Sequence, residues 1–444
     1  MRSIILLSLT IIPIFVQGQN LELGGYLQTD DRIFLREDYE LSWQDYMISL
    51  QAQATPLDNV NFFSEIWFRS RGCSTITKTS DLDDKGKIAP IKMELREAYV
   101  NIKGILMNSL DLRVGRQRIA WGTADKFNPT DNLNPDDLED IWDFGRHLGS
   151  NSVKLSYYPD IFTIEGVLVP VFTPAVLPPA NGQRIMTPQF SMPAGIVINN
   201  IYDSIILPEM NLKQCPTYGL KLSKNLFGFD LSMSYMYGRD DLPIANLMVL
   251  QPAGDSSKFD IYTRLIYPKL QILGADLAGE IKGLGFWAEA GLFFPEQIKM
   301  VIDLSAIGMG QIDSFVLEDK PYLKYVLGTD YTFRNGIYIN CQYVHGFINE
   351  RGNELLKDYL MLGMEWKLFG EKLKLMPVNL GVEIDDFKEF KDNYAIIYSP
   401  QVVYYPFDNT EISLGARLID GKNTTTFGRA KDNDEAFVQV KFSF

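Results

Sequence analysis

The chain has few of the residues that build disulfide scaffolds, metal centres and histidine-based active sites. Its 444 residues include three cysteines, Cys73, Cys215 and Cys341, and two histidines, His147 and His345. Three cysteines are too few for a disulfide framework, and none has the spacing of a metal ligand. Neither histidine lies near a recognisable nucleophile motif, so the sequence gives little support for a catalytic triad that uses histidine. We therefore expect no enzyme and no cofactor.

Positive charge is in the minority, and long apolar runs are confined to the start of the chain. The 42 Lys+Arg residues against 56 Asp+Glu give a formal net charge of -14, which argues against a nucleic-acid partner. The first residues, MRSIILLSLTIIPIFVQGQN, combine Arg2 with an apolar stretch too short to span a bilayer. We predict a signal peptide at residues 1–18, with a membrane anchor as the alternative, and secretion through the inner membrane.

What the sequence contains in abundance is two-residue alternation. The last segment, EAFVQVKFSF, has one apolar and one polar parity, which is the pattern of a half-buried strand. An alternating strand that ends the chain on Phe444 resembles the recognition signal of bacterial outer-membrane barrels. The same pattern recurs in segments of about ten residues, such as LELGGYLQTD, YMISLQAQA and VNLGVEIDD, as a membrane barrel requires.

About eighteen such segments follow one another along the chain. Their centres lie near residues 26, 50, 65, 98, 114, 154, 166, 220, 232, 274, 289, 327, 342, 363, 379, 400, 414 and 440. We therefore predict an all-β fold, a transmembrane antiparallel β-barrel of about 18 strands, with 16 as the alternative count. A soluble sandwich or propeller is the competing architecture, but the sequence shows no linker and no blade-length repeat.

Residues 19–444 are predicted to form this single barrel domain. Short periplasmic turns alternate with long external loops, expected at 72–91, 121–149, 172–216, 238–267 and 295–319. An even strand count returns both termini to the periplasmic side. It requires that residues 258–267 belong to a loop or to an extended hairpin.

The polar parity of such a barrel lines a water-filled lumen, because barrels of about 16 to 18 strands enclose a channel unless something plugs it. The segments MELREAYVNIKG and NSLDLRVGRQRIA form a hairpin that turns near Leu106 and brings Val100 opposite Leu112. Glu97 then faces the lumen together with Arg113 and Gln117.

Two arginines of the same hairpin conflict with this alternation. Arg96 and Arg116 have the lipid-facing parity, where an arginine costs roughly 2 to 4 kcal/mol at the bilayer midplane and little near the interface. We expect either a β-bulge that turns them inward or a position at the outer interface, close to lipopolysaccharide phosphates.

The segment after this hairpin is acidic, rich in proline and poor in apolar side chains. It follows the basic residues Arg113, Arg116 and Arg118 directly. The chain here resembles a large, uncharacterised family of Gram-negative outer-membrane barrels that is distantly similar to alginate-export porins. The matching positions are Arg113, Gly115, Arg116, Gln117, Trp121, Gly122, Asp125, Pro129, Asp131, Pro135 and Asp136, and LREAYV and YPKLQILGADLAGE look like further blocks of the family.

This resemblance implies that loop 121–149 folds into the barrel and meets the basic strand. Attraction between the carboxylates and the arginines makes such a fold physically reasonable. The predicted constriction comprises Glu97, Arg113, Arg116, Gln117, Arg118, Asp125, Asp131, Asp136 and Asp137. A calcium site at Asp131, Asp136, Asp137 and Asp140 is a weaker alternative, because the EF-hand spacing is missing.

The loop at 172–216 has a different chemistry. It is rich in proline and apolar side chains, so it is expected to plug the lumen, grip a hydrophobic substrate or dock a partner. Cys73 and Cys215 fall in external loops and are candidates for pairing.

These features together predict a porin-like channel for small solutes in the cell outer membrane, with loop 121–149 as its constriction. The alternatives are a plugged barrel that acts as a receptor, and a conduit for hydrophobic molecules. The expected partners are outer-membrane lipid, lipopolysaccharide, the barrel-assembly machinery, an unknown solute and, optionally, further copies of the chain.

Overall fold

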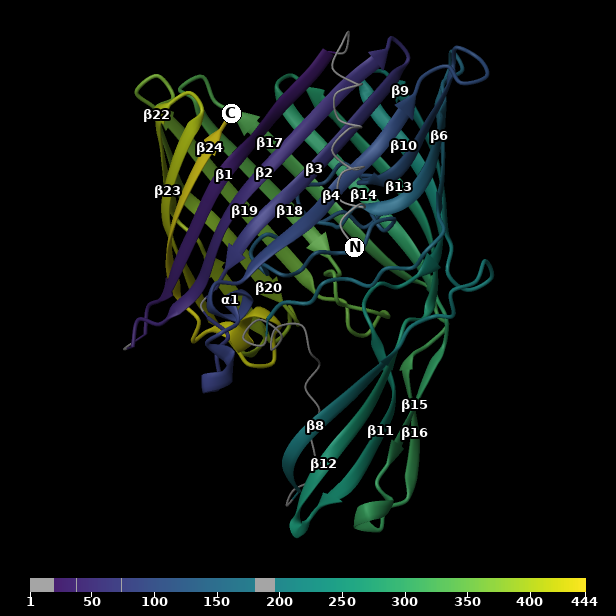
Figure 1. The fold of residues 1–444 in the computed structure, drawn as a ribbon, viewed down its shortest axis with the longest axis vertical. Coiled ribbons are helices and arrows are strands. Elements are labelled where there is room, and N and C mark those ends of the chain that lie inside the picture. Colours follow the sequence, from purple (N-terminus) through teal and green to yellow (C-terminus); the bar gives the residue numbers. More distant parts are fainter. Residues whose placement is uncertain (1–19, 37, 73, 180–195) are drawn as a thin grey trace, which may run out of the picture.

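The structure is a computed structural model that describes residues 20–36, 38–72, 74–179 and 196–444. The predicted signal peptide, residues 1–18, lies outside the described residues. Regular structure is almost entirely β (Figure 1). The strands are β1 (Asn20–Phe34), β2 (Leu41–Leu57), β3 (Val60–Arg71), β4 (Ile91–Ile102), β5 (Leu110–Gln117), β6 (Ser150–Tyr157), β7 (Thr163–Val169), β8 (Val197–Ile206), β9 (Thr217–Leu226), β10 (Phe229–Arg239), β11 (Ile244–Ala253), β12 (Asp255–Ile266), β13 (Lys269–Ile281), β14 (Leu284–Pro295), β15 (Ile298–Asp303), β16 (Gln311–Leu317), β17 (Tyr322–Thr332), β18 (Ile337–His345), β19 (Asp358–Leu368), β20 (Leu373–Ile384), β21 (Tyr394–Tyr398), β22 (Gln401–Phe407), β23 (Thr410–Gly421) and β24 (Glu435–Ser443). A short helix, α1 (Lys85–Ile88), lies between β3 and β4. Over the described ranges, no helix has the length and apolar character needed to cross a membrane.

Antiparallel pairing links the strands of the wall into a closed barrel. The first strand, β1, pairs with β2 on one side and with the last strand, β24, on the other. Gly25 and Phe444 exchange two backbone hydrogen bonds of 3.0 Å across this seam. Strands β21 and β22 both pair with β20 and β23, so they form one wall strand interrupted at Pro400. The wall therefore has 18 strands, which confirms the prediction.

The two ends of the barrel differ. At one end the strands are joined by tight turns, of which Phe227–Gly228 and Lys282–Gly283 have left-handed backbone at both positions (φ 56° and 83°, 54° and 84°). Such turns match the right-handed twist of paired strands. The other end carries the long connections (Figure 1). We call these the short-turn end and the long-loop end.

Three long connections build a second sheet beyond the long-loop end. Its strand order is β16-β15-β11-β12-β8, and Figure 1 shows it projecting away from the wall. Residues 258–267, which the strand count required to lie outside the wall, belong to β12 and the start of the return to the barrel. The sequence suggested loops or a hairpin here, whereas parallel pairs β11–β15 and β12–β8 join the three connections into one sheet.

The apolar loop 172–216 contributes one of these connections. Its residues 180–195 lie outside the described part of the chain, and residues 197–206 form β8 of the second sheet. Strand β8 lies beyond the barrel, whereas Val176, near the start of the same loop, exchanges backbone hydrogen bonds with Asp136 and Leu138 of loop 121–149.

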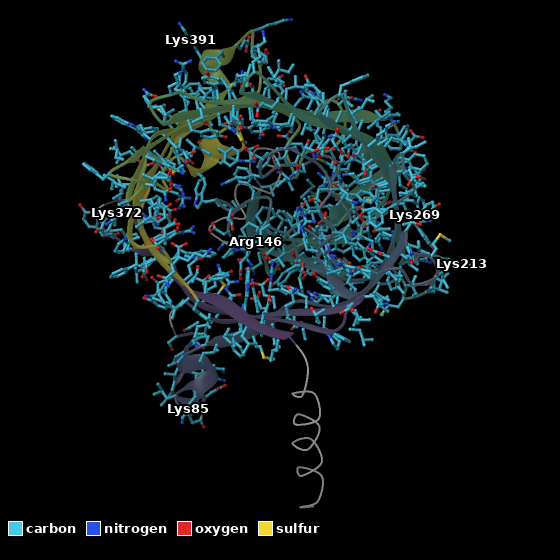
Figure 2. All side chains as sticks on the ribbon, turned by 90° about the horizontal axis from the view of Figure 1, so that it is seen from above. Lys85, Arg146, Lys213, Lys269, Lys372 and Lys391 are labelled. Carbon is cyan, nitrogen blue, oxygen red and sulfur yellow. The ribbon has the colours of Figure 1, made fainter. Side chains whose placement is uncertain are left out.

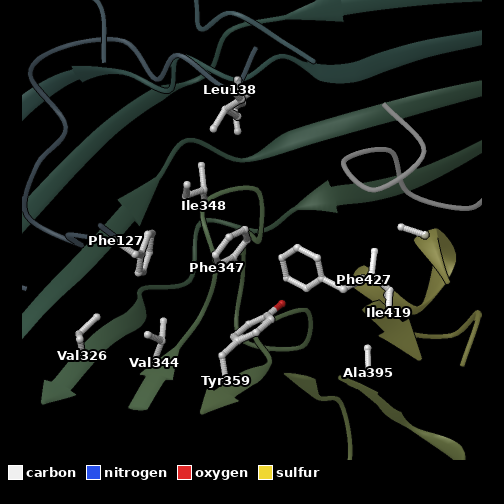
Figure 3. Close-up of a cluster of buried hydrophobic side chains, with 12 residues drawn as sticks. Phe127, Leu138, Val326, Val344, Phe347, Ile348, Tyr359, Ala395, Ile419 and Phe427 are labelled. Carbon is white, nitrogen blue, oxygen red and sulfur yellow. The ribbon is translucent and has the colours of Figure 1, made fainter. Parts of the chain in front are cut away.

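Buried apolar side chains gather inside the barrel, at the level of the long loops. One cluster joins Phe127 and Leu138 of loop 121–149 to Phe347, Tyr359 and Phe427 of other loops and strands (Figure 3). The interior is thus partly filled by folded loops that carry their own core.

The β4–β5 hairpin differs in register from the prediction. Val100 lies opposite Val114 rather than Leu112, a shift of two residues. A shift of two leaves the facing of every side chain unchanged, because the side-chain period of a strand is two. The long connection from Ile102 to Leu110 accounts for the difference, since its turn geometry is not set by alternation.

Candidate functional site in the barrel lumen

Loop 121–149 enters the lumen where β5 ends. Viewed along the barrel, Arg146 of this loop lies inside the ring of strands (Figure 2). The side chain of Asn134 secures the turn: its amide donates to the Gln117 carbonyl (3.0 Å), and its oxygen accepts the Ile119 N–H (2.7 Å). One buried asparagine therefore replaces the strand partner that β5 loses at this point.

The first charged contact joins the end of the strand to the loop. The Arg118 guanidinium makes a two-pronged ion pair with Asp131, with Nη1 at 2.9 Å from Oδ1. Asp131 is 3% exposed at its side chain, so the pair lies in a shielded environment where bidentate contacts are strong.

Arg96 makes the second contact, and a β-bulge places it. In the β3–β4 ladder Glu65 faces Glu97 and Ile66 faces Leu95, so Arg96 has no partner and turns inward. Its Nη1 lies 3.1 Å from Asp137, and its Nη2 donates to the His147 carbonyl (2.8 Å). Of the two explanations considered for Arg96, the structure shows the bulge.

Strands β1 and β3 supply the remaining arginines. Arg32 donates to Asp140 (3.0 Å), and Arg69 donates to Glu139 (2.6 Å), which also pairs with Arg71. Burial opposes ionisation of Asp140, but the hydrogen bonds and charge of Arg32 outweigh it and lower the pKa of Asp140 to about 2. Sequence reasoning missed these partners because they lie 68 to 108 residues from the loop.

The predicted residues of the β4–β5 hairpin divide into two groups. Glu97 accepts the Arg118 N–H (2.8 Å), and the Gln117 side chain, 0% exposed, donates to the Ser152 carbonyl (3.1 Å). Arg113 lies over the Tyr99 ring at 4.5 Å, and Arg116 has outward parity with Val114. Among the described residues, neither Arg113 nor Arg116 forms an ion pair with a carboxylate of the loop. Of the three expected basic residues, Arg118 therefore pairs with the loop, and arginines of other strands take the place of Arg113 and Arg116.

Backbone groups of the loop are held by one buried carboxylate. Glu289 of β14 accepts the N–H groups of Thr123 (2.8 Å), Ala124 (3.2 Å) and Thr130 (2.8 Å). Further along the wall, the amide of Asn340 donates to Asp125 (3.0 Å). These contacts join residues that lie 159 to 215 positions apart in the sequence.

Apolar packing anchors the loop as well, which the sequence analysis did not expect. Phe127 and Leu138 belong to the cluster of Figure 3, and Trp121 and Leu133 pack against wall residues such as Phe293. The apolar residues of the loop are scattered between acids and prolines and show no regular period. A search for two-residue alternation therefore does not detect them. Their burial adds a contribution that does not depend on charge.

Asp136 lies against a second acid, Asp241, of the β10–β11 connection. The Asp136 N–H donates to the Asp241 carboxylate (2.6 Å), and Asp240 beside it pairs with Arg351. Burial raises the pKa of Asp136 to about 7, and burial together with the Asp136 charge raises the pKa of Asp241 to about 7. Near neutral pH this acid pair therefore holds protons that ordinary carboxyls would lose.

A cleft of about 280 Å³ remains between the loop and the wall of β1, β2 and β3. Three tryptophans line it, each under a guanidinium: Arg32 lies 4.8 Å from Trp43, Arg96 lies 4.1 Å from Trp67, and Arg417 lies 5.4 Å from Trp142. Other lining side chains are Tyr26, Gln28, Asp30, Asp45, Met47, Arg69, Asp140, Asp143, Arg146 and Gln439. Balanced charge and flat apolar rings give this cleft a mixed polar and aromatic surface.

The four carboxylates of the calcium alternative do not come together. Asp131, Asp137 and Asp140 each face a different arginine, and the Asp136 carboxylate lies 3.4 Å from Nδ1 of His147. Within the described ranges, no three His, Cys, Asp or Glu side chains converge in a way that could hold a metal ion.

Cys73 lies outside the described residues, so its predicted pairing with Cys215 has no structural counterpart here. The Cys215 thiol is buried and free, and it donates to the Glu209 carbonyl (3.1 Å). The two histidines make structural contacts: His147 Nδ1 lies 3.1 Å from the Asn134 carbonyl, and His345 Nδ1 lies 2.7 Å from Asp358.

Comparison with known proteins places the fold. No protein-family model matches the sequence, and no curated protein matches it. Among solved structures, Pseudomonas aeruginosa OpdK, determined with vanillate, matches with a TM-score of 0.51 at 11% identity, covering 97% of this chain and 99% of that chain. Pseudomonas aeruginosa OccK9 (OpdG) matches with a TM-score of 0.50 at 11% identity, covering 97% and 98%. At this identity the likeness shows the fold alone, which is that of a porin-like outer-membrane barrel.

Proposed function

We propose that the protein is an outer-membrane channel for small solutes, narrowed by loop 121–149. The observation that carries this proposal is the fixed position of the acidic loop inside an 18-stranded barrel, against arginines of β1, β3 and β4. A barrel of this size encloses a wide lumen, so a loop anchored within it determines what passes. The cleft beside Trp67 and Trp142 is the proposed passage.

The outer wall supports placement in a membrane. Large apolar side chains are exposed on successive strands, which is costly in water and favourable in lipid. Examples are Leu23, Leu27, Ile48, Leu50, Phe62, Leu220, Leu222, Met233, Leu273, Leu323, Leu327, Leu414 and Phe442. We infer that the short-turn end faces the periplasm and that the barrel-assembly machinery recognises the strand ending in Phe444.

The motif family suggested by the sequence is part of this proposal. Its R-x-G-R-Q strand and acidic loop meet at Arg118 and Asp131, which is the type of contact that the resemblance implies.

Conductance of the purified protein in planar bilayers tests the channel. Wild type should give reproducible open-channel steps. The double variant Arg96→Ala/Arg118→Ala should give larger or noisier steps, because it leaves Asp137 and Asp131 without these partners. Breaking a buried ion pair costs about 3 to 5 kcal/mol, and the Arg96–Asp137 side chains are 8% and 3% exposed.

Arg113→Ala is the matched control, since Arg113 stacks on Tyr99 and should leave the loop in place. Absence of current from both wild type and the double variant would contradict the proposal that the protein is a channel. Equal steps and equal ion selectivity in wild type and the double variant would remove the loop from its proposed role as constriction.

The second sheet favours one further candidate, a barrel that binds a protein partner. Its edge strand β8 is exposed along most of its length, including Ile201 and Ile205. An exposed apolar edge offers unpaired backbone groups to an added strand. Ile201→Lys should abolish capture of such a partner without changing conductance; loss of conductance instead would contradict this candidate.

A further inference from the structure

The barrel wall is incomplete beside β4 at the long-loop end. Strand β4 pairs with β3 from Ile91 to Ile102 but with β5 only from Ala98 to Ile102. The cause is the turn of the chain into the lumen after Gln117, which ends β5 early. Within the described residues, β4 from Ile91 to Glu97 therefore has no ladder partner on this side.

A cavity of about 310 Å³ occupies this gap. Its lining crosses the wall: Arg96 turns towards the lumen, while Leu95 and Arg116 have outward parity. Leu148, in the segment that leads into β6, and Val176 line its remaining sides. The cavity thus opens towards the outer surface of the barrel, next to the long-loop end.

The charged residues around this cavity differ in whether they have an ion-pair partner. The three carboxylates that line it are each engaged by arginines: Glu94 by Arg69 and Arg96, Asp137 by Arg96 and Arg146, and Glu139 by Arg69 and Arg71. Two cations on the lining, Lys92 and Arg116, have no ion-pair partner anywhere in the described parts of the chain.

Arg116 is the more constrained of these two cations. Its Nε is buried and has no hydrogen-bond partner in the described residues. Burying a guanidinium donor without an acceptor is unfavourable, so this position favours an acceptor from outside the chain. An anion that reached the cavity would supply one through a charge-assisted hydrogen bond.

The surface beside the cavity suits the apolar part of a ligand. On the free edge of β4, the outward side chains Ile91 and Met93 are 70% and 71% exposed, and Leu95 and Val114 continue the strip towards the short-turn end. The two unpaired cations lie at the long-loop end of an apolar strip. This arrangement matches a lipid whose anionic headgroup lies at that end and whose acyl chains extend towards the short-turn end.

We propose that this gap binds the phosphate group of a membrane amphiphile, with Arg116 and Lys92 as its counter-charges and the Ile91–Leu95 edge beneath the acyl chains. The inference rests on the proposed outer-membrane position, because only there does lipid reach this edge. The shared ligand chemistry is a phosphate anion, and a lipid headgroup or free phosphate are its two sources.

Binding of dihexanoyl phosphatidic acid to the detergent-purified full chain, measured by titration calorimetry, tests the site. Wild type should bind it more tightly than dihexanoyl phosphatidylcholine, which has the same chains without net charge. Arg116→Gln should weaken binding roughly tenfold, since a charge-assisted hydrogen bond is worth about one such factor. Arg116→Lys should restore part of it, and Lys92→Gln should weaken it less. Lys282→Gln, in a turn at the opposite end, should bind as wild type does.

Inorganic phosphate separates the two sources. Arg116-dependent binding of inorganic phosphate as strong as that of phosphatidic acid would assign the site to free phosphate and overturn the lipid. Equal binding of phosphatidic acid by wild type, Arg116→Gln and Lys92→Gln would overturn the site itself. If Arg116→Gln fails to fold, the Lys92→Gln variant and the comparison of the two lipids still test the proposed phosphate site.

Conductance of the same preparations separates this inference from the proposed function. Protein that conducts but binds both lipids alike overturns the inference and leaves the channel. Protein that binds phosphatidic acid through Arg116 without conducting overturns the channel and leaves the lipid site.

Discussion

Among single residues, buried carboxylates and arginines decide where the loop lies. Arg96 illustrates the physics, because a one-residue bulge converts a lipid-facing cation into the partner of Asp137. A lipid-facing arginine costs roughly 2 to 4 kcal/mol at the bilayer midplane and little near the interface, so what the bulge supplies at this end of the barrel is the ion pair with Asp137.

Glu289 gives a prediction for one side chain. Glu289→Gln replaces one acceptor oxygen by an NH2 group, which then faces either the N–H of Thr130 or the N–H groups of Thr123 and Ala124. We expect the loop to lose about 1 to 3 kcal/mol of local stability, because a buried donor is left unsatisfied. Hydrogen exchange of loop amides measures this loss. Glu411→Gln in β23, whose carboxylate accepts the Ser413 hydroxyl, is the control and should leave loop exchange unchanged.

The acid pair of Asp136 and Asp241 predicts a pH dependence. Their pKa values are raised from 3.8 to about 7, so the anchored loop binds protons that the released loop would lose. Stabilisation by this pair is therefore largest below about pH 4, falls as pH rises to about 7, and stays low above that. Protection of loop amides, corrected for intrinsic exchange, should decrease across this window.

Asp241→Asn should weaken that dependence, because it removes one of the two titrating carboxyls and leaves Asp136, whose pKa is raised by burial. Asp143→Asn, at a loop carboxylate that is 60% exposed, should keep it. Identical pH profiles for wild type and Asp241→Asn would contradict the assignment of the dependence to this pair.

Among the elements, loop 121–149 behaves as an internal domain with polar and apolar anchors. Its path also depends on a close approach at Gly122, where φ is 92° and an added Cβ would lie 2.5 Å from the Glu289 carboxylate. Glycine is required there for two reasons: left-handed backbone and contact with an acceptor that holds the loop.

Gly122→Ala should therefore release the start of the loop, and the expected result is raised exchange at Thr123 and Ala124 together with noisier conductance. The matched control is Gly166→Ala in β7, where an added Cβ meets no atom within 4 Å. Equal effects of the two substitutions would mean that the strain at Gly122 is absorbed elsewhere.

In the molecule as a whole, the wall and the second sheet are separate structures. Their strands share no ladder in the described part of the chain, since β8, β11, β12, β15 and β16 pair among themselves. A closed barrel has no need of external strands, because each wall strand already has two partners.

Replacing residues 299–316 of the β15–β16 hairpin by a short Gly-Ser linker should therefore leave barrel folding and conductance intact. Exchange at β11 should rise, since β11 loses its pairing with β15. The same replacement in the wall hairpin, at residues 271–293, should prevent closure and serves as the contrasting case. Loss of barrel folding in the 299–316 variant would show that the second sheet supports the wall.

Local sequence pattern is enough to place the wall. Alternation, turn residues and an apolar outer parity predicted all 18 strand positions, because a membrane barrel repeats one local rule along each strand. The basic and acidic segments of 113–140 were equally visible, and the contact of Arg118 with Asp131 joins residues only 13 apart.

The contacts inside the barrel depend instead on closure of the wall. The acids of the loop find their partners on distant strands: Asp137 pairs with Arg96 of β4, Glu139 with Arg69 of β3, and Asp140 with Arg32 of β1. The bulge at Arg96, the apolar anchors of the loop and the parallel pairs of the second sheet likewise join segments that no local pattern relates. Periodicity reports which face a side chain occupies, whereas closure of the barrel decides which faces meet.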